Sequence, residues 1–189
     1  MIYIDDKIQE YSAEQIAQWT AELPLWRRER TEAIKHDIGR RQSLLAYRLL
    51  CKGLCEEYGI KAPPAFVYNE HGKPFLVSSP FFSLSHCREA VACAISDQPV
   101  GVDIECRRRV SDSLIRYTMN EEEQHVIMSL PSVCEREWEF LRLWTQKEAV
   151  AKLLGTGIRD DMKNILASGD YCLETRESGQ WVMSVASFR

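Results

Sequence analysis

The sequence lacks several features that mark well-known classes of protein. None of its apolar runs approaches the ~20 residues that a helix needs to cross a bilayer. Its first residues lack the basic start and apolar stretch of a signal peptide. It has no Walker-type Gly-rich loop and no kinase signature, which argues against a phosphotransferase that acts on nucleotides. We therefore expect a cytoplasmic protein with no membrane association.

The cysteines and the charge exclude further classes. The seven cysteines are odd in number and form no Cys-x-x-Cys pair. Cys51 and Cys55 are one helical turn apart, but no His or Cys has the spacing to complete a metal site, so we expect buried, reduced thiols. The net charge of −4 argues against a nucleic-acid binder. Arginines nevertheless gather in three groups, which favours local contact with a small polyanion or an acidic partner. The groups are Arg27, Arg28 and Arg30; Arg40 and Arg41; and Arg107, Arg108 and Arg109.

The most informative segment holds two carboxylates, Asp103 and Glu105, around Ile104. The apolar residues of this segment predict a buried strand, in which Asp103 and Glu105 share one face and Ile104 takes the other. Two carboxylates about 4 Å apart repel by roughly 4 kcal/mol at an effective dielectric near 20, so a proton or cation is expected between them. Mg²⁺ prefers such oxygen ligands together with substrate phosphates. The simpler alternative is a solvated strand end.

A long helix is predicted from about residue 134 to 154, ending at Gly155. Its apolar stripe consists of Phe140, Leu143, Trp144, Ala151 and Leu154. Lys147 falls near the middle of this stripe, where an unpaired ammonium would be costly to desolvate, so we expect its head to reach an anion. Glu148 and Lys152 are four residues apart and lie along one edge of the stripe. An ordinary helix salt bridge is the alternative for this pair.

In each of two successive parts of the chain, predicted helices are followed by predicted strands. Helices are expected over 12–20 and 25–58, with a break near Gly39, and strands over 65–68, 81–85 and 90–96. After Pro99 a strand is expected up to Glu105, followed by a helix near 113–116. A further helix is expected to begin at a capping box of Asn120 and Glu123. Strands at 171–175 and 181–185 close the chain. We predict an α+β fold of two similar halves, residues 1–98 and 99–189.

Taken together, these motifs resemble the signature of the 4'-phosphopantetheinyl transferases. The resemblance joins Gly-Val-Asp-Ile-Glu to Trp-Thr-Gln-Lys-Glu-Ala-Val-Ala-Lys, with Glu105 and Glu148 at their metal positions. Further matches point to the larger, monomeric Sfp-type branch and extend the resemblance over roughly residues 25–160. They are the Gly-Lys-Pro turn at 72–74, Phe82-Ser83-Leu84-Ser85-His86, Gly155-Thr156-Gly157-Ile158, Arg27-Arg28-Glu29-Arg30 and Ser43-Leu44-Leu45.

The resemblance implies a pseudo-dimer of two α+β halves with coenzyme A in the cleft between them. It implies that Asp103, Glu105 and Glu148 hold Mg²⁺, and that Glu148 is the base for a serine hydroxyl of an apo acyl or peptidyl carrier protein. The serine would attack the β-phosphate, take phosphopantetheine and release 3',5'-ADP. Lys152 would neutralise the pyrophosphate. The expected coenzyme A contacts are Arg27 and Arg30, at the 3'-phosphate, together with Ser43, Lys73, Ser85, His86 and Lys147.

Several points stay open at this level. Glu123 suits either a helix cap or the metal site, and Glu122 is a second candidate for the metal. Arg107 to Arg109 either contact the acidic recognition helix of a carrier protein or lie in a solvated loop. The chain ends soon after its last predicted strand, which we expect to affect carrier docking rather than the metal site. The alternative function is a non-catalytic module that binds coenzyme A or a carrier protein on the same fold. Such a module should lack a metal carboxylate or the helix lysine, whereas Asp103, Glu105, Glu148 and Lys152 are all present.

Overall fold

The computed structural model describes residues 1–78, 80–157, 162–167 and 169–189. The fold is α+β, as predicted. In chain order the elements are β1 (Ile2–Asp5), α1 (Ala13–Ala21), α2 (Leu25–Glu32), α3 (Asp37–Tyr58), β2 (Val67–Tyr68), β3 (Pro74–Phe75), β4 (Phe81–His86), β5 (Val91–Ser96), β6 (Val100–Cys106), α4 (Asp112–Thr118), α5 (Glu121–Ser129), α6 (Val133–Leu154), the 3₁₀ turn η1 (Met162–Asn164), β7 (Tyr171–Glu177) and β8 (Trp181–Phe188).

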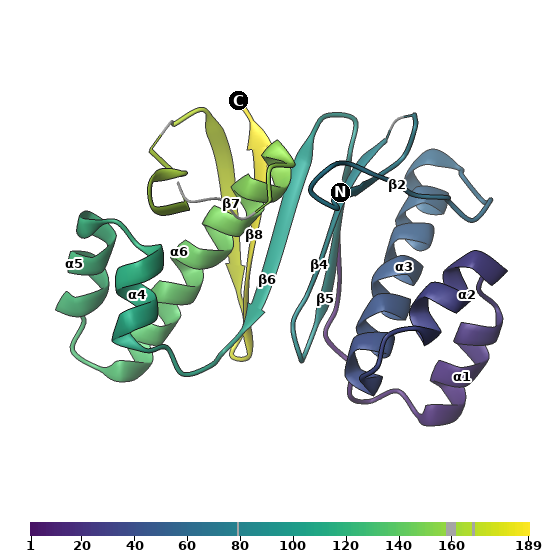
Figure 1. The fold of residues 1–189 in the computed structure, drawn as a ribbon, viewed down its shortest axis with the longest axis horizontal. Helices are drawn as coiled ribbons and strands as arrows, with labels where there is room; N and C mark the ends of the chain where they lie inside the picture. Colours follow the sequence, from purple (N-terminus) through teal and green to yellow (C-terminus); the bar gives the residue numbers. More distant parts are fainter. Residues whose placement is uncertain (79, 158–161, 168) are drawn as a thin grey trace.

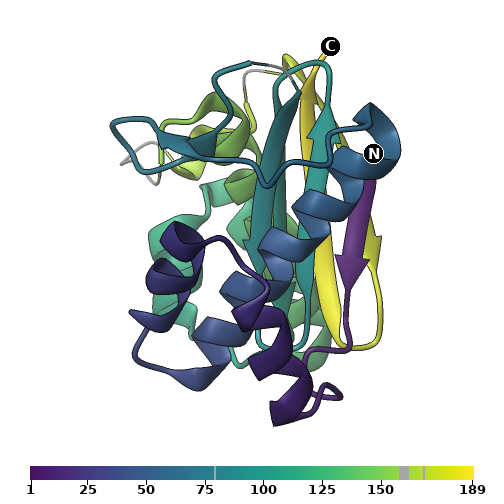
Figure 2. The same cartoon turned by 90° about the vertical axis from the view of Figure 1, so that its right-hand side faces the viewer.

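Two three-stranded antiparallel sheets stand next to each other at the centre of the molecule (Figure 1). One has the order β1-β5-β4 and packs against α3, whereas the other has the order β6-β8-β7 and packs against α6. Both helices are 22 residues long, and they lie on opposite sides of the view in Figure 1. A small β2–β3 hairpin forms a sheet of its own and protrudes at the left of the view in Figure 2.

The two sheets meet at β4 and β6, and they meet through side chains. No backbone ladder pairs these strands among the described residues. Instead, the Val102 N–H donates to Ser83 Oγ at 3.0 Å, and the Ile104 N–H donates to Ser85 Oγ at 3.3 Å. Next to this junction, Val102 and Ile104 pack into one apolar cluster with small residues of β5. The serines therefore satisfy strand N–H groups that would be costly to bury without a partner.

Most of the predicted helix ends are confirmed. The predicted capping box of Asn120 and Glu123 begins α5, and the predicted Gly155 ends α6 with φ of 69°. Gly59 ends α3 in the same left-handed conformation, with φ of 65°. Because this conformation costs little for glycine, both helices stop where the sequence places one. The capping box at Ser132 that begins α6 was not predicted. Among the described residues, no helix combines the length and the apolar character that a bilayer span needs.

Three expectations about the first half need correction. The helical segment from residue 25 breaks over 33–36, and Gly39 lies inside the first turn of α3 rather than at the break. The strand β1 was not predicted, because it is short and owes its place to pairing with β5. Cys51 is half-buried and Cys55 is exposed, although both are free thiols as expected. The boundary between residues 98 and 99 stays a prediction; each three-stranded sheet takes its strands from one side of it.

Candidate active site

The candidate site begins where α6 crosses β6 at Gly101. A Cβ atom at this position would lie 1.9 Å from the carbonyl oxygen of Ala149 and 2.5 Å from the amide nitrogen of Leu153. Only glycine allows the helix backbone to come this close to the strand. The alternation of β6 places Asp103 on the same face as Gly101, while Ile104 packs into the core on the other face, as predicted. This contact therefore brings the α6 side chains to the β6 carboxylates.

Asp103, Lys152 and Ser85 form one buried network between the halves. Lys152 Nζ lies 2.7 Å from Asp103 Oδ1 and donates to Ser85 Oγ at 2.8 Å. The Ser85 hydroxyl in turn donates to Asp103 Oδ1 at 2.8 Å. Because Asp103 and Ser85 are buried and Lys152 is largely so, water screens this ion pair little. Ser85 thus positions the carboxylate in this structure as well as joining the two sheets.

Glu148 and Glu105 complete the acidic group. The pKa of Glu148 is raised to about 7, first by burial and then by the Asp103 carboxylate; Lys152 opposes this shift and Glu105 adds to it. Burial is the main cause that raises the pKa of Glu105, and repulsion from Asp103 is the second. The Trp144 side chain lies near Glu105 and favours its charged form, which lowers the pKa. The three carboxyl groups therefore repel one another across the strand–helix contact.

The chemistry of this group fits a divalent cation in part. Asp103 Oδ2 and Glu148 Oε1 are buried and have no hydrogen-bond partner among the described residues, so each needs a proton or a cation. Carboxylate oxygens are the ligands that Mg²⁺ prefers. In the described part of the chain, however, no three His, Cys, Asp or Glu side chains are arranged closely enough to hold an ion. The Lys152 ammonium compensates Asp103 in this arrangement.

A pocket of about 250 Å³ opens beside these residues, lined by Glu148 and Lys152 of α6 and by the turn before β3. Lys73 of this turn donates to the Lys152 carbonyl at 2.5 Å, and burial followed by repulsion from Lys152 lowers its pKa. Asn69 fixes the turn: its Oδ1 accepts from the Lys73 N–H at 2.8 Å, and its Nδ2 donates to the Gly155 carbonyl at 2.8 Å. Two lysines thus converge on one small pocket.

His86 ends β4 close to the same lysine. Desolvation lowers the pKa of its imidazole, and the Lys152 ammonium lowers it further, so the ring is neutral near pH 7. A neutral imidazole donates one hydrogen bond and needs no counterion. Of the predicted residues, Ser85, His86, Asp103, Glu105, Glu148 and Lys152 form one electrostatically connected group, with Lys73 joined through Lys152.

The predicted residues of the first helices form a separate basic group. The buried Arg27 donates through Nη2 to the carbonyl and the hydroxyl of Ser43, at 2.7 and 2.8 Å. Its guanidinium also lies over the Tyr47 ring at 4.9 Å. Arg30 stacks over the Tyr68 ring of the β2–β3 hairpin at 4.3 Å. These contacts preorganise both cations between α2 and the hairpin.

The structure gives Lys147 a different role from the predicted one. Its ammonium is fully buried and lies 2.8 Å from Glu123 Oε2. The same ammonium donates hydrogen bonds to the carbonyls of Met162 at 2.9 Å and Lys163 at 2.7 Å. The expected anion is therefore Glu123, and this geometry does not support a contact with coenzyme A. Glu123 also accepts from the Asn120 N–H in the predicted capping box. The same carboxylate thus caps α5 and pairs with Lys147, and neither contact involves the metal group.

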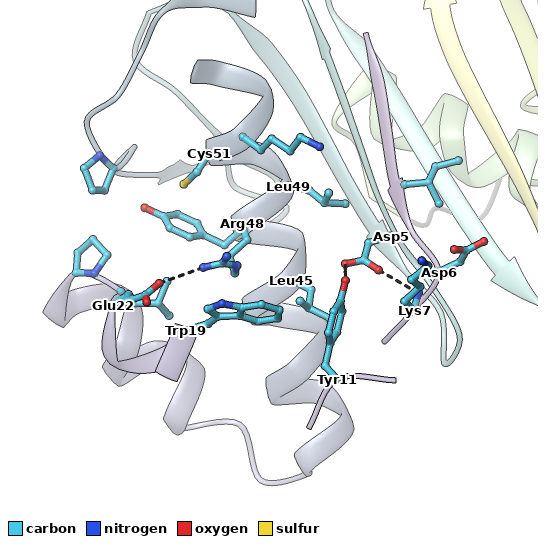
Figure 3. Close-up of a pocket in the computed structure, with 16 residues that line it drawn as sticks. Asp5, Asp6, Lys7, Tyr11, Trp19, Glu22, Leu45, Arg48, Leu49 and Cys51 are labelled. Carbon is cyan, nitrogen blue, oxygen red and sulfur yellow. Dashed lines mark hydrogen bonds and ion pairs between the residues drawn. The ribbon is translucent and has the colours of Figure 1, made fainter. Parts of the chain in front are cut away.

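A larger hollow lies elsewhere, between α1, α3 and the end of β1 (Figure 3). It measures about 740 Å³, and several of its polar groups bond to each other. Glu22 lies 3.4 Å from Arg48, whose guanidinium stacks over Trp19 at 4.3 Å, and Tyr11 donates to Asp5 at 2.9 Å. The smaller pocket at Glu148 is the better candidate site, because it adjoins the unpartnered carboxylate oxygens.

Comparison with known proteins shows what this chain is similar to. Residues 99–179 match the model of the 4'-phosphopantetheinyl transferase superfamily. Similar proteins include 4'-phosphopantetheinyl transferase gsp of Aneurinibacillus migulanus, 35% identical over 62% of this chain and 49% of the relative. Two others are psf-1 of Bacillus pumilus, 29% identical over 87% of this chain, and Sfp of Bacillus subtilis strain 168, 26% identical over 83% of it. The chain is therefore similar, over its second half, to the 4'-phosphopantetheinyl transferase superfamily. It spans about half the length of the first relative and 70% of the other two.

The superfamily match covers β6 and α6, and therefore every carboxylate of the acidic group. Sequence reasoning missed three residues that shape the site: Gly101, Asn69 and Trp144. The first two had a signal, because Gly101 opens the Gly-Val-Asp-Ile-Glu motif and Asn69 precedes the Gly-Lys-Pro turn. Trp144 was assigned to the apolar stripe, where its polar edge gave no sign of a partner. Ile158, the last residue of the predicted Gly-x-Gly-Ile match, lies outside the described residues.

Proposed function

We propose that this protein transfers 4'-phosphopantetheine from coenzyme A to a serine of an apo acyl or peptidyl carrier protein. The observation that supports this most directly is the close contact at Gly101. It joins the two superfamily motifs, with Asp103 and Glu105 on β6 and Glu148 and Lys152 on α6, beside a pocket that Lys73 also lines. The similarity of residues 99–179 to the superfamily suggests the class of reaction. The proposal includes the monomeric state and the cytoplasmic location predicted from the sequence.

In this mechanism Glu148 accepts the proton of the carrier serine. Its Oε1 has no partner among the described residues, and a pKa of about 7 suits a general base that works near neutral pH. The serine oxygen then forms a bond to the β-phosphorus of coenzyme A, and the bond from that phosphorus to 3',5'-ADP breaks. Lys152 and Lys73 place positive charge where the pyrophosphate gains negative charge. Asp103, Glu105 and Glu148 would hold Mg²⁺, which neutralises phosphate charge when bound.

The rest of coenzyme A would lie along the junction of the two halves. Arg27 and Arg30 are preorganised by their aromatic contacts and suit the 3'-phosphate, because a guanidinium binds phosphate through two parallel hydrogen bonds. Ser43 holds Arg27 in this position through two acceptors. His86 and Ser85 lie beside Lys152 and would contact the pyrophosphate. The substrate would thus bridge the basic group of α2 and the lysines of the pocket.

The proposal predicts a covalent change on the carrier. Incubation with coenzyme A, Mg²⁺ and a panel of apo carrier proteins should add one phosphopantetheine group to at least one carrier, as measured by intact mass. A carrier whose acceptor serine is replaced by alanine is the matched control and should stay unmodified. If no carrier gains mass although the protein binds coenzyme A, the alternative of a non-catalytic binding module is correct.

The raised pKa of Glu148 also predicts how stability depends on pH without metal. The group binds a proton more tightly when folded than at its ordinary pKa of 4.5, so it stabilises the fold fully below pH 4.5 and loses this effect as the pH rises through about 7. In EDTA, the free energy of unfolding should therefore fall by up to about 3 kcal/mol between pH 5 and pH 8.

Urea titrations at both pH values measure this change. Glu148→Gln should remove most of the loss, since glutamine does not titrate, and added Mg²⁺ should restore stability at pH 8 if the carboxylates hold it. An unchanged slope in Glu148→Gln would mean that another group titrates. No effect of Mg²⁺ on the wild-type protein at pH 8 would contradict the predicted metal site.

A further inference from the structure

Two free cysteines lie opposite each other where β4 and β6 end. The side-chain contacts between these strands follow a fixed register, because Ser83 meets Val102 and Ser85 meets Ile104 at the same separation of 19 residues. One more step of two residues along each strand brings Cys87 opposite Cys106 at the same separation. Both sulfurs belong to the same apolar cluster, in which Cys87 is buried and Cys106 partly buried.

Their thiols lie close enough to interact electrostatically. The Cys106 sulfur accepts the Glu89 N–H at 3.2 Å, within the turn that Cys87 opens. The neighbouring turn is tight, because the Cys87 N–H donates to the Ala90 carbonyl at 2.8 Å. A disulfide needs two side chains that approach each other from adjacent backbones, and these two strands are adjacent at Ser83–Val102 and Ser85–Ile104. Cys106 is the more accessible of the two and is therefore the one that an oxidant reaches first.

We infer that Cys87 and Cys106 form a reversible redox pair that can link the two sheets covalently. The oxidant would be a small disulfide such as oxidised glutathione. The Cys106 thiolate attacks one of its sulfurs and releases one thiol, and the Cys87 thiolate then displaces the second thiol as the Cys87–Cys106 bond forms. Two protein thiols and one small disulfide thus give one protein disulfide and two small thiols. Transient pairs of this kind are typical of redox sensing in reducing compartments.

The position of the pair gives it a consequence for the site. Cys87 follows His86 directly, and Cys106 follows Glu105. A disulfide brings its two sulfurs to about 2.05 Å, so its formation would draw together the two strand ends that hold these residues. Small displacements of reacting groups lower rates by up to about 100-fold. We therefore expect the oxidised form to transfer phosphopantetheine about tenfold more slowly, an expectation that rests on the proposed function.

The full-length protein should be equilibrated in glutathione buffers of increasing oxidised fraction, alkylated under denaturing conditions and weighed intact. Two of the seven cysteines should escape alkylation, and peptide mapping should place the link between Cys87 and Cys106 rather than Cys93. Dithiothreitol should restore full alkylation. Cys106→Ser should lose the link, while Cys172→Ser, at an exposed cysteine of β7, should keep it.

Full alkylation in every buffer, a link through any other cysteine, or glutathione adducts alone would overturn the inference, whether or not the protein is active. Transfer rates measured on the same samples test the second part. A linked protein with an unchanged rate would overturn the effect on the site. A reduced protein that modifies no carrier would instead refute the proposed function, and the alkylation result would still decide the redox pair.

Discussion

Replacement of Glu148 by glutamine should lower the rate of carrier modification by about 1,000-fold, the range expected for loss of a general base. Glutamine keeps the size of the side chain but cannot accept a proton. It also removes one of the three carboxylates that repel each other, so the variant should fold at least as stably as the wild type above pH 7. Initial rates with saturating coenzyme A and carrier, followed by intact mass, measure the change in kcat.

Glu139→Gln is the matched control. Glu139 lies on the same helix, but its carboxylate pairs with Arg142 three residues later and belongs to no part of the acidic group. Its replacement should change the rate by less than about twofold. Full activity in Glu148→Gln would show that another group takes the serine proton. That result would refute the role of Glu148 but not the proposed transfer.

Replacement of Gly101 by alanine should destabilise the fold by about 3 kcal/mol or more, because the new methyl group meets backbone atoms that cannot turn away. The nearest are the Ala149 carbonyl oxygen at 1.9 Å and the Leu153 amide nitrogen at 2.5 Å. Relief requires α6 to move away from β6, which also separates Glu148 and Lys152 from Asp103. The folded fraction should therefore lose activity by about 100-fold, a loss typical of misplaced catalytic groups.

Urea unfolding compared with Gly179→Ala tests this expectation. A Cβ at Gly179 meets no atom within 4 Å, and its backbone does not require glycine, so this control should stay within about 0.5 kcal/mol of the wild type. Equal stability of the two variants would mean that α6 and β6 do not depend on their close contact at Gly101. The site would then need another explanation for how its two motifs are held together.

The sequence predicted the elements whose signals are local. The capping box of Asn120 and Glu123 fixes the start of α5, Gly155 fixes the end of α6, and the alternation around Ile104 fixes which residues of β6 face the core. The same local logic placed Asp103 and Glu105 on one face. The superfamily resemblance then supplied what no periodicity shows, namely that this face meets α6.

The misses have a common physical cause, which is a partner distant in the sequence. The stripe position of Lys147 required an anion, but nothing local identified it as Glu123 of α5 rather than a ligand. β1 has only four residues and becomes a strand through its pairing with β5. The bonds of Ser85 to Asp103 and Ile104 across the junction were not predicted, because they follow from the meeting of two separate sheets.

That junction has a consequence for how sequences descended from this one can diverge. A backbone ladder forms between almost any two sequences, since every residue other than proline brings the same donor and acceptor. The hydroxyls of Ser83 and Ser85 are instead specific to these two positions. The distance and the angle between the two sheets thus depend on the side chains of Ser83 and Ser85. Single substitutions there can reshape the cleft for a different substrate while each sheet keeps its own hydrogen bonds.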